Sequence, residues 1–333
     1  MAKRATMYDV AQTAGVSLMT VSRVVNNKDD VSQVTRDRVL GVIEHLNYRP
    51  SSIARGLATQ RTGTLGVVVP DISNPFFASI VRSAEEEAYS KDYSVFLGNT
   101  NEDPERELAV LQSLEDKHVD GLILCSSRLG DDTLFEILEH FPTTVLVFRE
   151  KKDANVGAFT IDDVFGGQVA IEHLLKSGHR NIGLISGPPI SLSSFGRLKG
   201  YQAALQAAGI PINDRWIRNC HPVVEGGQDT AYDLLKHHPE ITALFCHNDL
   251  VAVGAMQACA ELGLQVPDDL AIIGYDDIRL AALVSPALTT LHIPRAQIGA
   301  KTMQMLLEQI EVEAAEPKEI HLKPELIVRA SAP

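Results

Sequence analysis

A change of rhythm near residue 64 constrains the fold of this 333-residue chain more than any other feature of its sequence. Beyond that point, short runs of β-branched and apolar residues alternate with helical stretches of about ten to fifteen residues. Such alternation predicts βαβ units built around a parallel sheet. The runs expected as strands in the first half are residues 65–69, 95–97, 121–124 and 145–148.

The same alternation recurs in the second half of the chain, with strands expected at 182–186, 243–246 and 270–275. Helices are expected between them, for example over 195–208 and 250–262. The chain after residue 63 is therefore predicted to form an α/β body of two tandem doubly wound parallel-sheet lobes, with a cleft between them. In open parallel sheets ligands bind beyond the carboxyl ends of the strands. No glycine-rich phosphate loop follows any of these strands, which disfavours an enzyme with a nucleotide cofactor.

The first 48 residues have a different pattern, which predicts three short helices. Thr6 and Asp9 form a capping-box pattern before the first apolar run. A glycine then interrupts the run, Ser17 can cap a second helix, and Ser32 or Thr35 can cap a third. Helix, glycine-containing turn and helix is the arrangement of DNA-binding helix-turn-helix domains. The alternative is a purely structural three-helix bundle.

Charge is distributed unevenly along the chain. The formal net charge is -13, but residues 1–61 carry nine Lys or Arg and five Asp or Glu side chains, a net charge of +4. The remaining residues therefore carry -17. Because affinity for phosphates comes from Lys and Arg side chains, only the N-terminal region suits contact with DNA. Residues 50–63 between the two parts are expected to be a linker that becomes helical on binding.

Several classes of protein are disfavoured by composition. No run of about 18 apolar residues exists and the N-terminus lacks the apolar region of a secretory signal, so we expect a cytoplasmic protein without a membrane partner. The four cysteines are far apart in sequence and form no CxxC pair, so no metal site, redox motif or cofactor is expected. They are predicted to be small buried apolar residues: Cys125, Cys220, Cys246 and Cys259.

The chain resembles the lactose and galactose repressor family of bacterial transcription regulators over essentially its whole length. The resemblance rests on YDVAQTAGVSLMTVSRVVNN, VSQVTRDRV and LNYRP near the N-terminus, and on VVVPDISNPFF, HVDGLILCSS, GHRNIGLISG, GRLKGY, FCHNDLVAVGA and IIGYDD in the body. It implies an all-α helix-turn-helix head over 1–49, a hinge helix over 50–63 and a body like that of periplasmic sugar-binding proteins. The N-terminal lobe would comprise 64–162 plus 292–322, and the C-terminal lobe 163–291 plus 323–333.

The resemblance also implies which residues contact DNA. Residues 17–26, from Ser17 to Asn26, would form the recognition helix, with Leu18 and Met19 at the variable base-reading positions and Arg23 directed to a guanine. The residues expected to contact phosphates are Thr6, Tyr8, Thr20, Ser22 and Tyr48. For the two tyrosines, packing within the head is an equal alternative.

In the hinge segment SSIARGLATQ, the resemblance makes Leu57 an apolar wedge that enters a base step from the minor groove. Ala54 and Ala58 are small enough to let two such helices approach each other. Packing of Leu57 on the body is the alternative. Because one hinge helix is too short to be stable alone, a homodimer is expected. The C-terminal LIVRASAP has no heptad pattern for a larger coiled-coil assembly.

The effector contacts that the resemblance implies are Phe76, Arg149, Asp162, Arg197, Asn248 and Asp276. Adjacent acids at strand ends are often helix caps, which is the alternative for Asp162 and Asp276. The family commonly has an aspartate where this chain has Phe148. A purine or nucleoside stacked on aromatic rings is therefore an alternative to a simple sugar or sugar phosphate.

The resulting hypothesis is a dimeric, sequence-specific repressor that binds double-stranded operator DNA and is controlled by a small metabolite, a sugar or nucleoside, bound between the lobes. A glycosidase using paired carboxylates is an alternative with little support, since no defined carboxyl separation follows from the sequence. A sugar-binding module without DNA binding is the other alternative, which the cationic head disfavours. His179 and His247 have no metal-ligand spacing and are predicted to be structural.

Overall fold

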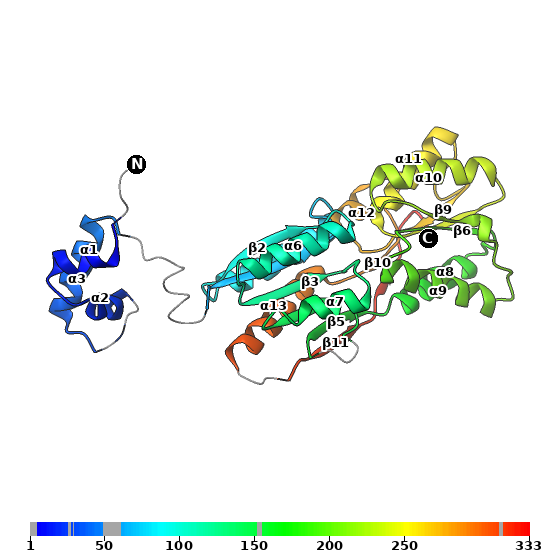
Figure 1. Cartoon of the computed structure of the whole chain (residues 1–333). Coiled ribbons are helices and arrows are strands. Elements are labelled where there is room, and N and C mark those ends of the chain that lie inside the picture. The colour runs from blue at the N-terminus through cyan, green and yellow to red at the C-terminus, as the bar shows by residue number, and fades with distance from the viewer. Residues whose placement is uncertain (1–4, 26–27, 29, 49–60, 152–154, 313–315) are drawn as a thin grey trace. The chain divides into compact units, whose positions relative to one another are not determined.

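The computed structural model describes residues 5–25, 28, 30–48, 61–151, 155–312 and 316–333. The chain divides into two compact units, residues 1–63 and 64–333, which are described separately. The first unit, the head, contains three helices: α1 (Met7–Ala14), α2 (Leu18–Val25) and α3 (Gln33–His45). The second unit is the α/β body (Figure 1).

Local side-chain hydrogen bonds set the ends of the head helices. Thr6 and Asp9 form the predicted capping box at the start of α1, and Gly15 ends that helix in the left-handed conformation, with φ of 63°. The Ser17 hydroxyl accepts a hydrogen bond from the backbone N–H of Thr20 at 3.1 Å and so caps α2. Ser32 caps α3. The sequence-based prediction of three capped helices is confirmed.

A small apolar core joins the three head helices. It is made from buried side chains of all three helices together with Tyr48, which follows α3: Val10, Ala11, Ala14, Val21, Val24, Val39 and Tyr48. Because these positions lie on one face of each helix, burying them leaves the opposite faces in contact with solvent. The exposed face of α2 carries Leu18 and Met19.

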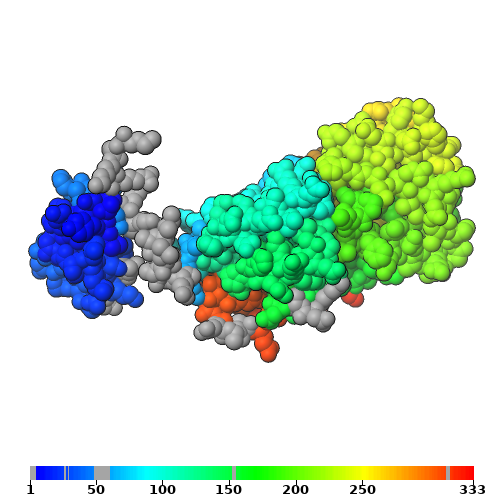
Figure 2. All heavy atoms as spheres, viewed as in Figure 1, coloured from blue at the N-terminus to red at the C-terminus, as the bar shows by residue number. Residues whose placement is uncertain are grey.

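The first lobe of the body is built on a six-stranded parallel sheet with the order β11-β5-β4-β3-β1-β2. Its strands are β1 (Thr64–Val69), β2 (Ser94–Asn99), β3 (Gly121–Cys125), β4 (Thr144–Val147), β5 (Gly157–Ile161) and β11 (Glu319–Leu322). Its helices are α5 (Pro75–Tyr89), α6 (Pro104–Asp116), α7 (Asp131–Leu138) and α13 (Arg295–Glu311). In Figure 2, orange α13 lies against this cyan and green lobe.

Alternation along the strands places helices on both faces of this sheet. Val67 and Val69 of β1 belong to the apolar cluster that includes Ile80 of α5 and Ile298 of α13. Val68 belongs to a second cluster, which includes residues of α6 and α7. Successive side chains of a strand point to opposite faces, so a run apolar at every position is buried on both.

The second lobe has a four-stranded parallel sheet with the order β7-β6-β8-β9. Its strands are β6 (Ile182–Ser186), β7 (Ile217–Asn219), β8 (Ala243–Cys246) and β9 (Ala271–Ile273). The helices of this part of the chain are α8 (Asp163–Lys176), α9 (Leu192–Ala207), the short 3-10 helix η1 (Asp214–Trp216), α10 (Val224–His237), α11 (Asp249–Leu262) and α12 (Arg279–Leu283).

A two-stranded antiparallel sheet completes the body, pairing β10 (Thr290–His292) with β12 (Glu325–Ile327). The chain thus runs from the first sheet into the second, then back through β10 and α13 to β11 of the first. The predicted fold class is confirmed, with β5, β7 and the last three strands being elements that the sequence patterns did not predict. The lobe boundaries at residues 162, 291 and 322 stay a prediction.

Candidate functional site

The exposed face of α2 is the first candidate site. This helix covers residues 18–25 where residues 17–26 were expected, and Leu18 and Met19 are 47% and 65% exposed. Arg23 lies in its last turn, where its guanidinium forms an ion pair with Asp30 at 2.9 Å. Both partners are about half-exposed. The Arg23 side chain is thus held at the surface by a pairing weak enough to exchange for another hydrogen-bond acceptor.

The other predicted DNA contacts differ in accessibility. Thr6 and Ser17 are exposed but serve as helix caps, and Thr20 and Ser22 are half-buried. Tyr8 is 63% exposed, whereas Tyr48 packs in the head core. Packing, the alternative weighed for both tyrosines, is therefore what the structure shows for Tyr48. Asn26, Ala54, Leu57 and Ala58 lie outside the described residues, and contact of this whole set with DNA stays a prediction.

A small cavity of about 40 Å³ lies between the two lobes of the body. Four of the six predicted effector contacts line it: Phe76, Arg197, Asn248 and Asp276. They come from the N-termini of α5 and α11, from α9, and from the segment after β9. The residues that the resemblance implied thus lie where the rule for parallel sheets expects a ligand, beyond the carboxyl ends of the strands.

Three aromatic residues line this cavity on the first-lobe side: Phe76, Phe77 and Phe148. Phe76 follows Pro75 in the first turn of α5, where the Asn74 side chain accepts the Phe76 N–H. Phe148 directly follows β4 with φ of 60°, a left-handed conformation that turns it out of the strand direction. The two ring centroids are 5.5 Å apart and the planes are tilted by 37°. Such a pair can cover the apolar face of a ring-shaped ligand.

Arg197 is the central cation of the second-lobe side. Its Nε donates to Asp163 at 2.9 Å, and its Nη1 donates to the carbonyl oxygen of His247. The guanidinium also lies 3.6 Å from the centroid of the Tyr275 ring. These contacts hold a buried charge in one orientation, with its carboxylate partner supplied by the first residue of α8.

Asp276 lies beside Arg197 in the cavity wall and is buried. Burial raises the pKa of its carboxyl to about 7, against the opposing effect of the positive charges of Arg197 and Arg295. Its backbone carbonyl accepts a hydrogen bond from Arg295, which anchors a residue with φ of 110°. The carboxyl can therefore exchange a proton near neutral pH.

A buried ion pair in the first lobe completes the polar lining. Arg128 Nε donates to Glu102 at 2.5 Å, and both side chains are less than a tenth exposed. Asn248 caps α11 by accepting the Val251 N–H at 2.8 Å and donates to the Pro222 carbonyl at 3.2 Å. The charged groups are thus two arginines, each paired with a carboxylate, together with Asp276.

Arg149 and Asp162, the other two predicted contacts, do not line the small cavity. Arg149 donates to Asp131 at 2.5 Å and to the carbonyl oxygens of Leu129 and Ser127. Asp162 caps α8 by accepting the Phe165 N–H at 2.9 Å, which is the alternative weighed for it. Both line a larger open groove of about 660 Å³ next to the cavity, and their contact with an effector stays a prediction.

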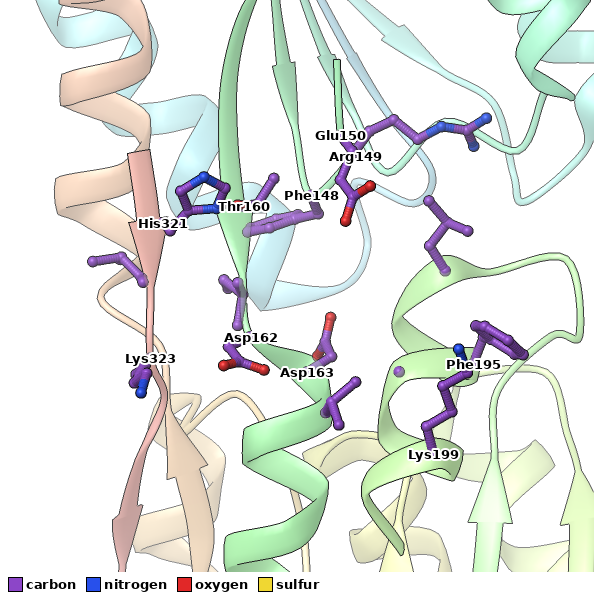
Figure 3. Close-up of a pocket in the computed structure, with 15 residues that line it drawn as sticks. Phe148, Arg149, Glu150, Thr160, Asp162, Asp163, Phe195, Lys199, His321 and Lys323 are labelled. Atoms are coloured by element: carbon purple, nitrogen blue, oxygen red, sulfur yellow. Dashed lines mark hydrogen bonds between the residues drawn. The ribbon is translucent and has the colours of Figure 1, made fainter. Parts of the chain in front are cut away.

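This outer groove shares Phe148, Ile161 and Asp163 with the small cavity. Figure 3 shows Asp162 and Asp163 on one side and Phe195 and Lys199 of α9 on the other, with Arg149 pointing away from the two aspartates. The Lys199 ammonium lies 4.3 Å from the centroid of the Phe195 ring. The groove therefore adjoins the cavity.

Sequence reasoning missed several residues of the cavity, among them Glu102, Arg128, Asp163 and His247. Arg128 and His247 come shortly after β3 and β8, so the strand-end rule applied to every strand would have found both. Asp163 directly follows Asp162, the aspartate that the resemblance implies as an effector contact. Glu102 comes shortly after β2 and would have been found by the same rule, but only the packing of the first lobe shows that it pairs with Arg128.

The remaining expectations concern metals, membranes and cysteines. Within the described ranges, no cluster of three or more His, Cys, Asp or Glu side chains could hold a metal ion. No described helix combines the length and the apolar character that crossing a bilayer requires. Cys125, Cys246 and Cys259 are buried and Cys220 is half-buried, and all four are free thiols.

Each of the two units matches a known protein family. Residues 6–51 match the model for bacterial regulatory proteins of the LacI family, and residues 62–330 match the model for periplasmic binding proteins and the sugar-binding domain of the LacI family. The transcriptional repressor PurR of Haemophilus influenzae strain PittEE is 38% identical, covering 98% of each chain. PurR of Klebsiella pneumoniae strain 342 is also 38% identical, covering 98% of this chain and 96% of the relative.

Solved structures agree in fold over nearly the whole length. A Lac repressor dimer bound to operator and the anti-inducer ONPF has a TM-score of 0.87 at 28% identity, covering 99% of each chain. The transcriptional regulator CelR in complex with cellobiose has a TM-score of 0.73 at 31% identity, covering 98% of this chain and 100% of the other. These relatives are regulators rather than enzymes, so the glycosidase alternative is wrong. The match over residues 6–51 likewise disfavours a binding module without a DNA-binding head.

Proposed function

Because this chain belongs to the LacI family and is a DNA-binding transcription repressor with a small-metabolite site, we propose that its effector is an uncharged ring compound with several hydroxyl groups, a sugar or a nucleoside. The observation that carries this proposal is the balance of charge in the cavity between the lobes. Arg128 and Arg197 are already neutralised by Glu102 and Asp163.

A phosphate group would have no unneutralised cation to bind in this cavity, which disfavours the sugar phosphate that the sequence left open. Hydroxyl groups suit the lining better, because they donate to carboxylates and accept from guanidinium groups. The tilted pair of Phe76 and Phe148 supplies the apolar surface that a sugar ring edge or a base needs.

The lobes must separate for such a ligand to bind. The small cavity holds about 40 Å³, whereas small-molecule sites usually measure roughly 300–1,000 Å³. The outer groove adjoins it, so we place the entry route there. A ligand held by Phe148 in the first lobe and Arg197 in the second would then select one angle between the lobes, and that angle would control the hinge and head.

DNA recognition in this proposal combines a specific and a non-specific part. Arg23 would donate two hydrogen bonds to a guanine, while Leu18 and Met19 would contact thymine methyl groups or exclude other bases. The cationic head would bind phosphates, and Leu57 would wedge a central base step of a two-fold operator bound by a homodimer. We place the protein in the cytoplasm, on the nucleoid when it is bound to its operator.

Two measurements test the proposal. Selection from a randomised duplex library should recover a pseudo-palindromic site, as expected for a dimer with two recognition helices. Calorimetry of the full chain with neutral sugars and nucleosides should then identify a ligand that changes affinity for the selected site. Binding of phosphorylated compounds alone would contradict the proposed charge balance.

A further inference from the structure

We propose that His247 is a specificity-determining residue for the effector, in which Nδ1 accepts a hydrogen bond from one hydroxyl group of the bound ring compound. This inference rests on the function proposed above and assigns a role to a residue that the sequence patterns marked as structural. It begins from the position of His247, which directly follows β8 and precedes the cap residue of α11.

The backbone of His247 is fixed on both sides. Its N–H donates to the carbonyl oxygen of Ile185 at 2.7 Å, and its own carbonyl oxygen accepts from Arg197. The residue is 8% exposed and lines the small cavity together with Arg128, Arg197 and Asp276. His247 is therefore part of a rigid wall of the site.

The imidazole ring is also held in place by a close contact with Gly187. A Cβ atom at Gly187 would lie 2.7 Å from both Cε1 and Nε2 of His247 and 2.8 Å from its Cδ2. The distal half of the ring therefore packs directly on the Gly187 backbone. Only a residue without a side chain leaves room for the ring in this orientation.

The Nδ1 atom of this ring is buried and has no hydrogen-bond partner among the residues that the structure describes. Buried polar atoms in folded proteins are almost always hydrogen-bonded, because an unpaired one is destabilising. His247 lines the cavity, so a ligand that enters when the lobes separate can supply the partner that Nδ1 lacks. Position, burial and the missing partner together indicate a group reserved for recognition.

The charge around the ring determines what Nδ1 can offer. Burial, and then the positive charges of Arg197 and Arg128, hold the pKa of His247 well below its ordinary value. A neutral imidazole has one N–H donor and one acceptor nitrogen. The positive charges of the two guanidinium groups favour this neutral ring. In the proposed complex its proton lies on Nε2, so Nδ1 acts as an acceptor and calls for a hydroxyl donor.

The two arginines also locate His247 at the boundary of the lobes. Arg128 follows β3 of the first lobe, and Arg197 lies in α9 beside the second-lobe sheet. A hydroxyl bound to Nδ1 would therefore connect the second lobe to a ligand whose ring rests on Phe76 and Phe148 of the first. Loss of this bond should weaken closure as well as affinity.

The test uses calorimetry of the full chain with D-ribose, D-glucose, adenosine and inosine. His247→Leu keeps the approximate volume and removes Nδ1, whereas His247→Asn keeps a polar atom at the same distance from Cβ. We expect the leucine variant to bind the best of these probes about fivefold to thirtyfold more weakly, and the asparagine variant to recover most of the affinity. His237→Leu, at an exposed histidine of α10, is the matched control and should leave affinity unchanged.

Analogues of that probe, each lacking one hydroxyl group, identify the bond itself. One analogue should bind wild type and His247→Leu equally weakly, because the same hydrogen bond is already absent in both. Equal affinity of wild type and His247→Leu for the parent probe would overturn the role of His247 alone. Failure of wild type to bind any of the four probes would instead overturn the proposed effector class, and the role of His247 with it.

Gly187→Ala gives a second variant that leaves His247 itself intact. The added methyl group should displace the imidazole and weaken binding of the parent probe to a similar extent as His247→Leu. It should also reduce the difference in affinity between the parent probe and the analogue that lacks the hydroxyl group. An unchanged preference for the parent probe in Gly187→Ala would contradict the proposed position of Nδ1.

Discussion

Arg23 has two competing partners, one inside the head and one on DNA. In the structure it pairs with Asp30 at the protein surface, at 2.9 Å. A guanine offers it two acceptors, which is a stronger arrangement than a half-exposed ion pair. The short α2 helix fixes where the side chain starts, and the flexible end of the side chain lets it change partner.

We predict that Arg23→Ala weakens operator binding by about 1–3 kcal/mol and relaxes the preference at one base pair in each half-site. Asp30→Asn should leave operator affinity the same or raise it, because a competing acceptor is removed. Arg82→Ala, at an exposed arginine of α5, is the matched control and should have no effect. Fluorescence anisotropy with operator and scrambled duplexes measures all three, and equal loss on both duplexes for Arg23→Ala would contradict base reading.

Asp276 should make both stability and effector binding depend on pH. Its pKa is raised from 3.8 to about 7 by burial, so the folded state binds its proton more tightly than the unfolded state. The stabilisation of the folded state by the protonated Asp276 is fully present below about pH 4 and is lost as pH rises toward 7. Relative to Asp276→Asn, the free energy of unfolding of wild type should therefore fall by up to about 1.4 kcal/mol per pH unit in this range.

Urea unfolding of both proteins at several pH values measures that difference. The same pH dependence of the free energy of unfolding in wild type and Asp276→Asn would contradict the prediction.

Effector affinity should show the opposite dependence on pH. A ligand hydroxyl that donates to Asp276 favours the carboxylate, so binding should release a proton and tighten as pH rises toward 7. Calorimetry in buffers of different ionisation enthalpy detects the released proton.

At the scale of elements, close helix pairs hold the cavity residues in position. α8 begins with Asp163 and α9 contains Arg197, so the ion pair between them depends on how closely these helices approach. Gly200 of α9 makes that approach possible. A Cβ atom there would lie 2.2 Å from the carbonyl oxygen of Val164 and 2.7 Å from the backbone nitrogen of Gln168.

Gly200→Ala should therefore force α8 and α9 apart. We expect the free energy of unfolding to fall by about 1–3 kcal/mol, as for other overpacked sites, and effector affinity to fall because Arg197 loses its fixed partner. Gly41→Ala makes the same change in helix α3, where no atom lies within 4 Å of the new methyl group. That control should keep or increase stability by up to about 1 kcal/mol. Equal effects of the two substitutions in thermal unfolding would refute the close-packing argument.

At the scale of the whole molecule, the head and the body are separate compact units of opposite charge. The only route by which an effector can change DNA affinity is a difference in its affinity for two arrangements of the lobes. The resulting coupling free energy is typically about 1–3 kcal/mol and must be reciprocal.

We predict that a saturating operator duplex changes the effector dissociation constant by the same factor by which saturating effector changes the operator dissociation constant. Calorimetry with and without the duplex measures the first factor, and anisotropy with and without effector measures the second. A scrambled duplex of equal length is the control for charge alone. An effector dissociation constant that the operator duplex leaves unchanged would contradict coupling between the two sites, and clearly unequal factors would mean that the titrations had not reached equilibrium.

Short-range patterns were enough to predict the head and the parallel sheets, and the family resemblance supplied four residues of the cavity. Helix caps such as Thr6 and Ser32 act within one turn, and a buried parallel strand such as β3 is apolar along its whole length, so both can be recognised from neighbouring residues. The pairing of Arg128 with Glu102, the choice between Asp162 and Asp163, and the contact of His247 with Gly187 were settled by tertiary structure alone. These contacts depend on how strands and helices far apart in the chain pack together, and no local pattern encodes that packing.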